Sequence, residues 1–302
     1  LSNTVDWIGY TLHIGENEVT ARIKESFMQD FQQLTVDLMK RPRITLDTLR
    51  SYAGKANHIA TLVYNWRPFL DQLWAALKNR KESSNAPAHM IWVRQIISSL
   101  KWLLVFLEGT QGELIRSWRV DLFSNLGDIF VMILDASPFG FGGVLTKNGK
   151  VLSWFASSIS DDDVAIHKHP RGDNRGQQTW ESLCVLIAVR CWAKFWVNTK
   201  TTITLKSDNM TALALAAKLK SNVSPLISKE LALAFSASSF QPRFIEHIPG
   251  VFNVSADALS RLEDPCGTYV VPGYLRSEDR CTPAVRSHSW YCALPRKRGR
   301  GM

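Results

Sequence analysis

A single five-residue run constrains the fold of this chain more than the rest of its sequence does. Residues 130–134 (FVMIL) are continuously apolar and rich in β-prone side chains, and Asp135 follows them directly. A strand that is buried on both faces has this composition, because neither face carries alternating polar residues. We therefore expect a central strand of a covered sheet, with an acidic side chain at its carboxyl end.

The segments after this run alternate between strand and helix patterns. Residues 140–145 predict a hairpin partner for the central strand, and residues 160–178 are polar and predict a solvated loop or insertion. Further strands are predicted at residues 151–157, 201–206 and 243–248, and helices at residues 180–196, 211–220, 225–237 and 256–262. This order implies an α/β domain, a mixed five-stranded sheet with flanking helices.

The first hundred residues have a different, mainly helical pattern. Residues 1–20 predict a hairpin with its turn near residues 15–17, and apolar residues from Ile23 to Leu38 then recur at helical spacing. Further expected features are a helix capped by Thr45, a helix with Pro68 in its first turn, a polar loop over residues 79–87, a long helix from Trp92 to Leu107, and stops at Gly109 and Gly112.

The length of 302 residues suits two domains. We predict a mainly α-helical domain over residues 1–118 and the α/β domain over residues 119–264. Residues 265–302 hold four prolines and six arginines without periodicity, which predicts a basic, disordered tail. The chain begins at Leu1 and not at Met, so we expect it to be a piece of something longer.

Charge and cysteine content narrow the class of protein only loosely. The net charge is +9, but residues 265–302 carry most of it, which supports a polyanionic partner weakly. The five cysteines form no CxxC pair, so neither a zinc site nor a disulfide scaffold is indicated and a reducing compartment is expected. No signal peptide or membrane span is visible, which predicts an intracellular protein, cytoplasmic or nuclear, without a membrane partner.

Four acidic residues occupy positions where a sheet and its helices would bring them together: Asp135, Glu181, Asp208 and Asp257. Each has an ordinary explanation alone, such as a helix cap, a turn or a helix-dipole interaction. Together they would repel each other unless cations held them, and hard carboxylate oxygens suit Mg²⁺, with Mn²⁺ as a substitute. Two such ions can activate water and stabilise the leaving oxygen of a phosphodiester, so the pattern indicates a metal-dependent nuclease.

These residues also lie in motifs that resemble a known family. Residues 135–143, 180–183 and 207–209 are similar to successive motifs of retroelement ribonuclease H. Residues 247–261 (HIPGVFNVSADALSR) resemble the end of that domain in reverse transcriptases of retrotransposons and plant pararetroviruses. The resemblance covers about residues 128–262. It implies hydrolysis of the RNA strand of RNA–DNA hybrids, with no small-molecule cofactor.

The resemblance also implies roles for individual residues. Asp135, Glu181, Asp208 and Asp257 would be catalytic and would bind two Mg²⁺ ions. His247 stands where family members place a mobile histidine that aids proton transfer or product release, although a surface histidine on a turn has the same pattern. Asn209 would contact the nucleic-acid backbone or cap a helix, and Asn253 would shape its loop.

Two departures from the family pattern stand out. The segment before Glu181, which includes residues 161–163 and the histidines His167 and His169, is longer than usual. A solvated loop is the expectation for it, with metal binding by these histidines the minor alternative. No lysine-rich element for gripping substrate is evident.

The first hundred residues resemble the segment that follows the palm of a reverse transcriptase. Residues 7–12 are similar to the strand after the palm, and residues 49–77 to thumb helices. By this resemblance Lys55, Arg67 and Arg94 would contact phosphates of a template–primer duplex, and the missing palm and fingers of the parent polyprotein would be partners. The chain has no Tyr-x-Asp-Asp turn, so no polymerase activity is expected from it alone.

Three other functions are compatible with parts of this pattern. A catalytically inactive duplex-binding clamp, or a relic retroelement fragment, would keep the fold without cleavage. A DNA strand-transfer enzyme would end on a Glu at different spacing from Asp257. An aspartic protease half-site at Asp135 is disfavoured, because Ala136 and Ser137 do not make the required Asp-Thr/Ser-Gly turn.

Overall fold

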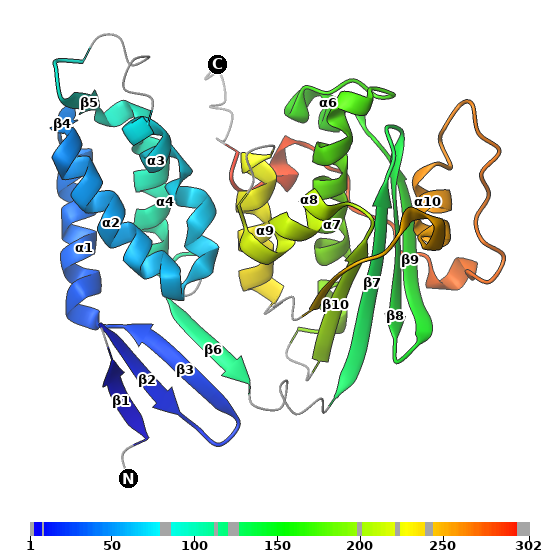
Figure 1. Ribbon diagram of the computed structural model, residues 1–302, viewed down its shortest axis with the longest axis horizontal. Coiled ribbons are helices and arrows are strands. Elements are labelled where there is room, and N and C mark those ends of the chain that lie inside the picture. The colour runs from blue at the N-terminus through cyan, green and yellow to red at the C-terminus, as the bar shows by residue number, and fades with distance from the viewer. Residues whose placement is uncertain are drawn as a thin grey trace, which may run out of the picture. The chain divides into compact units, whose positions relative to one another are not determined.

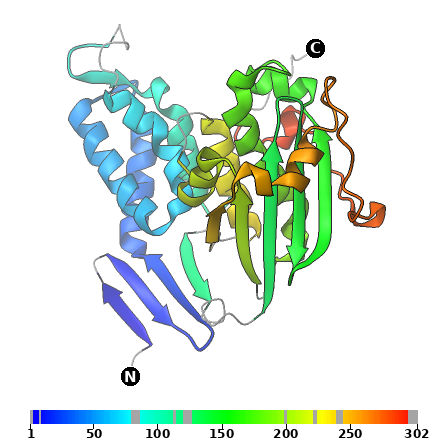
Figure 2. The same cartoon turned by 45° about the vertical axis from the view of Figure 1, so that its right-hand side comes forward.

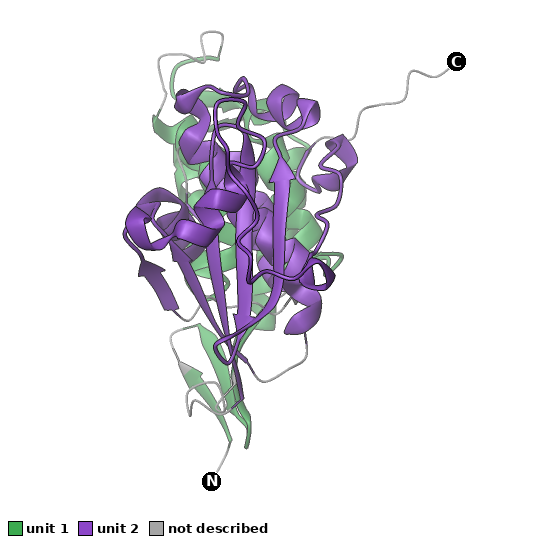
Figure 3. Ribbon diagram, turned by 90° about the vertical axis from the view of Figure 1, so that its right-hand side faces the viewer, with its two compact units in different colours: residues 1–124 green, residues 125–302 purple. Residues whose placement is uncertain are grey.

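A computed structural model of the chain describes residues 3–7, 9–78, 86–111, 114–119, 127–197, 201–220, 224–238 and 244–294. The chain divides into two compact units, residues 1–124 and residues 125–302, each of which is described by itself (Figure 3). The boundary predicted after residue 118 falls inside a strand of the first unit, so it is several residues too early.

The first unit contains a four-stranded antiparallel sheet of strand order β1-β2-β3-β6. Its strands are β1 (Thr4–Trp7), β2 (Tyr10–Ile14), β3 (Glu18–Ile23) and β6 (Ile115–Arg119). The predicted hairpin is confirmed, because the turn at residues 15–17 joins β2 to β3. The helical spacing predicted from Ile23 onward is wrong for Ile23 itself, which is the last residue of β3. Strand β3 pairs with β6, a contact that no local pattern reports.

Helices make up most of the remainder of this unit, as expected. They are α1 (Glu25–Met39), α2 (Leu46–Leu62), α3 (Asp71–Lys78) and α4 (Ile97–Leu107), with two 3-10 helices, η1 (Tyr64–Leu70) and η2 (Val93–Gln95). Two short strands, β4 (Arg43–Thr45) and β5 (Met90–Trp92), pair with each other.

The first unit has one of the local features predicted from its sequence, the Thr45 cap, and differs at two others. Thr45 caps α2, since its side chain accepts a hydrogen bond from the backbone N–H of Thr48 at 3.1 Å. Pro68 lies inside η1 and not in the first turn of α3. Trp92 ends β5 and pairs with Arg43, so the long helix begins only at Ile97. The predicted loop at residues 79–85 and the stop at Gly112 lie outside the described residues.

The second unit is built on a mixed five-stranded sheet of strand order β11-β10-β7-β8-β9, as the sequence predicts. Its strands are β7 (Asp128–Ala136), β8 (Gly140–Lys147), β9 (Lys150–Ser158), β10 (Thr201–Ser207) and β11 (Phe244–His247). Strand β10 runs parallel to both β7 and β11, whereas β8 and β9 are antiparallel to their neighbours. The apolar run at residues 130–134 is therefore the central strand.

Helices cover both faces of this sheet. They are α6 (Asp161–His167), α7 (Gln177–Trp192), α8 (Met210–Lys218), α9 (Pro225–Ser238) and α10 (Val254–Ser260). Short 3-10 helices are η3 (Asn174–Gly176), η4 (Ala193–Phe195), η5 (Gly250–Phe252), η6 (Ser277–Asp279) and η7 (His288–Trp290). Helix α7 packs on one face and α10 on the other, in the two views of Figures 1 and 2.

Helix α10 approaches the sheet very closely at Gly142. A Cβ atom on this glycine would lie 2.2 Å from the carbonyl oxygen of Ala256 and 2.7 Å from the side chain of Leu259. Only a residue without a side chain leaves room for the helix here. This close contact places the first turn of α10, which carries Asp257, beside the carboxyl end of β7.

The polar stretch at residues 160–178 is accessible to solvent except at Asp163 and Gly176, as predicted, but it is not a loop throughout. It forms α6, which begins with a capping box between Ser160 and Asp163, and η3. Asp163 is fully buried and pairs with Arg286, which is only 4% exposed. The composition of this stretch did not predict the burial of Asp163, because its partner is more than a hundred residues away in the sequence.

Residues 265–294 form an ordered strap and not the disordered tail predicted from composition. The Arg286 guanidinium bonds Asp163, the hydroxyl of Ser157 and a backbone carbonyl, and the backbone N–H of Cys281 bonds Trp154 O at 2.7 Å. The thiols of Cys281 and Cys191 lie 2.7 Å apart. These contacts fix the strap to β9, α6 and α7 through single side chains, which leave no periodic pattern in the sequence. The basic cluster at residues 296–300 lies outside the described residues.

Within the described residues, every helix is too short or too polar to traverse a lipid bilayer.

Candidate active site

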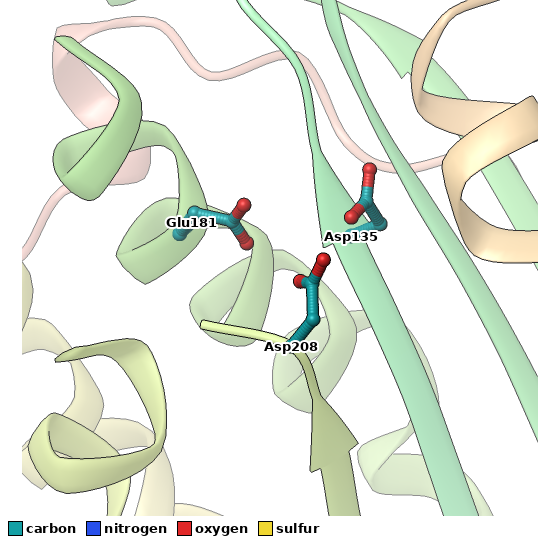
Figure 4. Close-up of side chains that lie close together, drawn as sticks. All are labelled: Asp135, Glu181 and Asp208. Atoms are coloured by element: carbon teal, nitrogen blue, oxygen red, sulfur yellow. The ribbon is translucent and has the colours of Figure 1, made fainter. Parts of the chain in front are cut away.

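Two parallel strands bring two of the predicted acidic residues to the same edge of the sheet. Asp135 is the next-to-last residue of β7, and Asp208 directly follows β10, its parallel neighbour. Because both strands run in the same direction, their carboxyl ends meet. Glu181 comes from α7, one turn after the helix begins at Gln177, and points toward the other two (Figure 4).

The three carboxylates form a compact cluster. One oxygen from each of Asp135, Glu181 and Asp208 lies within 4.8 Å of the others. Asp135 and Glu181 are each only 4% exposed, and Asp208 is half-buried. The prediction that these residues converge is therefore confirmed for three of the four carboxylates.

The fourth predicted carboxylate, Asp257, is not part of this cluster. It lies in the first turn of α10, and its Oδ1 accepts a hydrogen bond from Arg261 Nε at 2.6 Å. Asp257 is still close enough to Asp135 for its charge to raise the pKa of that carboxyl. An ion pair within α10, which the spacing of four residues allows, thus replaces the expected contact with the other three carboxylates.

Neighbouring residues take over the ordinary structural roles that two of these carboxylates could have played. The turn after Asp135 is closed by Ser137, whose Oγ accepts hydrogen bonds from the backbone N–H groups of two later residues. Helix α8 is capped by Asn209 and not by Asp208. Asn209 Oδ1 accepts hydrogen bonds from the backbone N–H groups of residues 211 and 212 in the first turn. Nothing in the described residues therefore gives Asp135 or Asp208 a turn-forming or capping role.

Hydrogen bonds hold the buried carboxylates in place. Ser260 Oγ donates to Asp135 Oδ2 at 2.6 Å, and Asn253 Nδ2 donates to Asp135 Oδ1 at 3.2 Å. Gln177 Nε2 donates to Glu181 Oε1 at 2.9 Å. Sequence reasoning assigned no such role to Gln177 or Ser260. The spacing of Gln177 could have indicated its role, because Gln177 stands one helical turn before Glu181.

Burial makes the negative charge of this cluster costly. Burial is the main cause that raises the pKa of Asp135 to about 7, with repulsion from Asp208 and Asp257 adding to it and the Ser260 hydrogen bond opposing it. Burial, followed by repulsion from Asp135, raises the pKa of Glu181 well above its usual range. Carboxylates in this state are stabilised by any cation that can reach them.

The donor set fits a hard divalent cation. Three carboxylates converge, and carboxylate and carbonyl oxygens are the ligands that Mg²⁺ and Mn²⁺ prefer. Beside them, Asn253 Oδ1 and Gln177 Oε1 are buried acceptors that have no hydrogen-bond partner among the described residues. A cation with its bound water would satisfy oxygens that the protein alone leaves short of donors.

His247 lies at the rim of the cluster. It is the last residue of β11, and its exposed ring donates from Nε2 to the backbone carbonyl of Asp208 at 3.0 Å. Donation from Nε2 leaves Nδ1 facing away from this bond. His247 thus contacts the backbone of Asp208, and a role in proton transfer stays a prediction.

Three other predicted nucleic-acid contacts lie on the first unit, and they are exposed. Lys55 projects from α2, Arg67 from η1 and Arg94 from η2. Arg67 Nε also bonds Ala60 O at 3.4 Å, and the Arg94 guanidinium stacks on Trp92 at 5.3 Å. These positions leave their charged groups accessible to a phosphate backbone.

His167 and His169 do not form a metal site with each other in the described residues. His167 Nε2 shares a hydrogen bond of 2.9 Å with the hydroxyl of Tyr291, and burial lowers its pKa to about 4. Both rings pack edge-on against Trp180. They are packing residues between α6, α7 and the strap.

The sequence matches no protein-family model and no curated protein. Among solved structures, it is similar to LC11-RNase H1, isolated from compost by a metagenomic approach (17% identity, TM-score 0.33, covering 44% of this chain and 91% of that one). It is also similar to RNase H1 from the halophilic archaeon Halobacterium salinarum (19% identity, TM-score 0.31, covering 44% and 92%).

A third similar structure is the foamy viral protease-reverse transcriptase, solved in complex with an RNA/DNA hybrid. The identity is 13% and the TM-score 0.31, and the match covers 82% of this chain but only 29% of the viral one. Similarities this low establish no activity for this chain.

Proposed function

We propose that this chain hydrolyses the RNA strand of RNA–DNA hybrids endonucleolytically with the help of divalent cations. The observation that carries the proposal is the buried cluster of Asp135, Glu181 and Asp208 at the carboxyl edge of the central strands. Acidic residues this buried and this close are costly for a protein to keep unless they bind cations.

Each residue of the site has a defined task in this proposal. The three carboxylates hold a divalent cation, and Ser260 and Gln177 fix the orientation of Asp135 and Glu181. Bound there, Mg²⁺ or Mn²⁺ would activate a water molecule and stabilise the leaving oxygen of the phosphodiester. His247, at the rim, can accept or deliver a proton at the departing group once its ring turns away from the Asp208 carbonyl.

The choice of substrate rests on the sequence motifs. Four motifs occur in the order found in retroelement ribonuclease H, and the carboxylates of the first three converge in the fold. Asn209 is engaged as the cap of α8, so any contact with the nucleic-acid backbone would come from its remaining amide group.

We further propose that the parent protein is a retroelement reverse transcriptase. The first unit would hold a template–primer duplex, with Lys55, Arg67 and Arg94 contacting phosphates to position it without reading its sequence. The palm and fingers of the parent polyprotein would supply the polymerase activity that is not expected from this chain alone. The ribonuclease would act in the cytoplasm or nucleus.

A second candidate function is a duplex-binding clamp without catalysis. The ion pair between Asp257 and Arg261 favours it, because this pair removes one predicted ligand from the metal cluster. A clamp would bind an RNA–DNA hybrid in a gel-shift assay and leave it intact in Mg²⁺ and in Mn²⁺.

To separate the two functions, the full chain is incubated with labelled RNA–DNA hybrid, with duplex RNA and with duplex DNA. Each incubation is carried out with Mg²⁺, Mn²⁺ or EDTA. The nuclease proposal predicts internal cuts in the RNA strand of the hybrid alone, and only with a divalent cation. Hybrid binding without cuts in either metal, by folded protein, would favour the clamp.

A further inference from the structure

Arg261 occupies a position from which it can control the metal site. It follows the last residue of α10, and its Nε bonds Asp257 Oδ1 at 2.6 Å across one helical turn. Both side chains are about one-third exposed, at 35% and 36%. The same guanidinium lies 5.7 Å from the centroid of the Tyr269 ring, which belongs to the strap. Arg261 is thus held between an acidic side chain and an aromatic face.

The carboxylate that Arg261 holds is one that a second cation would require. Asp135, Glu181 and Asp208 can surround one ion, but two ions about 3.5–4 Å apart need further oxygen ligands. Asp257 is close enough to Asp135 for the two charges to repel, and it is turned into an ion pair instead. Arg261 and a second cation therefore compete for the same carboxylate.

We propose that Arg261 limits the site to one divalent cation and that a second cation binds only by taking Asp257 away from Arg261. This inference rests on the proposed metal-dependent function. A partly exposed ion pair is a weak competitor, because solvent screens it. Arg261 consequently lowers the affinity for the second ion without abolishing it, and the positive guanidinium disfavours that ion further by direct repulsion.

Tyr269 provides a way to disturb this competition without changing any charge. Its ring stacks on the guanidinium, and stacking of this kind contributes to holding an arginine in one orientation. Replacing the ring with an aliphatic side chain would free Arg261 to leave Asp257 more often. Removing only the hydroxyl would keep the stack.

The experiment is calorimetric titration of the full, EDTA-stripped chain with Mn²⁺ in the absence of nucleic acid. The wild-type chain should bind one ion, and a second ion at least about 10-fold more weakly. Arg261→Gln should tighten the second site by about 2- to 5-fold, the range that a partly exposed ion pair can supply, and leave the first site unchanged. Asp257→Asn should remove the second site alone, also in combination with Arg261→Gln.

Matched variants separate this role from a loss of folding. Tyr269→Leu should tighten the second site in the same direction but less, and Tyr269→Phe should leave it unchanged. Arg276→Gln removes an exposed arginine of the strap and should have no effect. Thermal melts of each variant without metal establish that the folded state is intact.

Two results would overturn the inference. One is a wild-type chain that binds two ions with equal affinity, and the other is a second-site constant that Arg261→Gln does not change. If Mn²⁺ binds but Asp208→Asn leaves that binding unchanged, the ion lies elsewhere, and the proposed function itself fails. The failure of the inference and that of the function are therefore told apart in one data set.

Discussion

At the scale of single residues, the unusual protonation of Asp135 has a measurable effect on stability. Its pKa in the folded, metal-free chain is raised to about 7 from the ordinary value of 3.8, mainly by burial. The folded state therefore binds this proton more tightly than the unfolded state does. Its contribution to the free energy of unfolding is complete below pH 3.8 and is lost as the pH rises through about 7.

We predict that the metal-free chain becomes easier to unfold between pH 5 and pH 8, and that Asp135→Asn flattens this dependence. The whole shift corresponds to at most about 4 kcal/mol, of which about 3 kcal/mol is lost between pH 5 and pH 8. Urea unfolding in EDTA at both pH values measures it. Asp128→Asn, at the exposed start of the same strand, is the control, because Lys147 and Asn148 lower the pKa of Asp128. The prediction would be contradicted if Asp135→Asn lost as much stability between pH 5 and pH 8 as the wild-type chain does.

Ser260 should act through Asp135. Its hydroxyl donates to Asp135 Oδ2, and this hydrogen bond holds the pKa of the carboxyl below the value that burial alone would cause. In Ser260→Ala, the cleavage rate should rise at a higher pH than in the wild-type chain. The rate at neutral pH should fall by about 10-fold. A pH–rate profile measures both changes.

The control for Ser260 is Ser255→Ala on the same helix, since Ser255 bonds Tyr274 and not a carboxylate. A loss of rate in Ser260→Ala that is the same at every pH would mean that the hydroxyl affects only folding.

The sequence predicted which residues belong to the site better than it predicted the contacts that these residues make. Asp135, Glu181 and Asp208 could be predicted, because strand ends and helix starts are recognisable from local patterns. The pairing of Asp257 with Arg261 could not be, because the same spacing is equally compatible with a side chain turned toward Asp135. Which of two nearby partners a carboxylate takes depends on packing around α10, including the close approach at Gly142.

At the scale of elements, the predictions failed where a segment depends on polar contacts with residues far away in the sequence. The sheet of the second unit was predictable, because its strands and α7 have strong local apolar patterns. Strand β6, helix α6 and the strap were not. Each depends on a partner distant in sequence: β3 for β6, and the pair of Asp163 and Arg286 for α6 and the strap.

This buried pair yields a prediction about the strap. Arg286→Leu would leave Asp163 fully buried without its guanidinium, which typically costs about 3–5 kcal/mol of unfolding free energy. Chemical denaturation measures the loss. The double variant Arg286→Leu with Asp163→Leu should recover part of it, since no unpaired charge remains. Arg276→Ala, at an exposed arginine of the same strap, should change stability by less than about 0.5 kcal/mol. Equal effects of Arg286→Leu and Arg276→Ala would mean that the pair is not structural.

At the scale of the whole molecule, the strap changes where the chain can be shortened. Composition predicted a disordered tail over residues 265–302. The structure instead predicts that a chain of residues 1–264 melts roughly 10 °C below the full chain, because it loses the anchors to Asp163 and Trp154. Calorimetry of the two lengths measures this difference. Equal melting temperatures would restore the disordered-tail interpretation.

The central claim is that the buried carboxylate cluster cuts RNA, and one measurement tests it most directly. The full chain and Asp208→Asn are compared for cleavage of a labelled RNA–DNA hybrid in Mg²⁺, with Mn²⁺ and EDTA alongside. Asp208 is the half-buried member of the cluster, so its substitution removes a ligand at the least buried of the three positions. We predict metal-dependent internal cuts by the wild-type chain and a loss of at least about 100-fold in the variant. Cleavage at the wild-type rate by folded Asp208→Asn would contradict the site, and no cleavage by the folded wild-type chain in either metal would contradict the function.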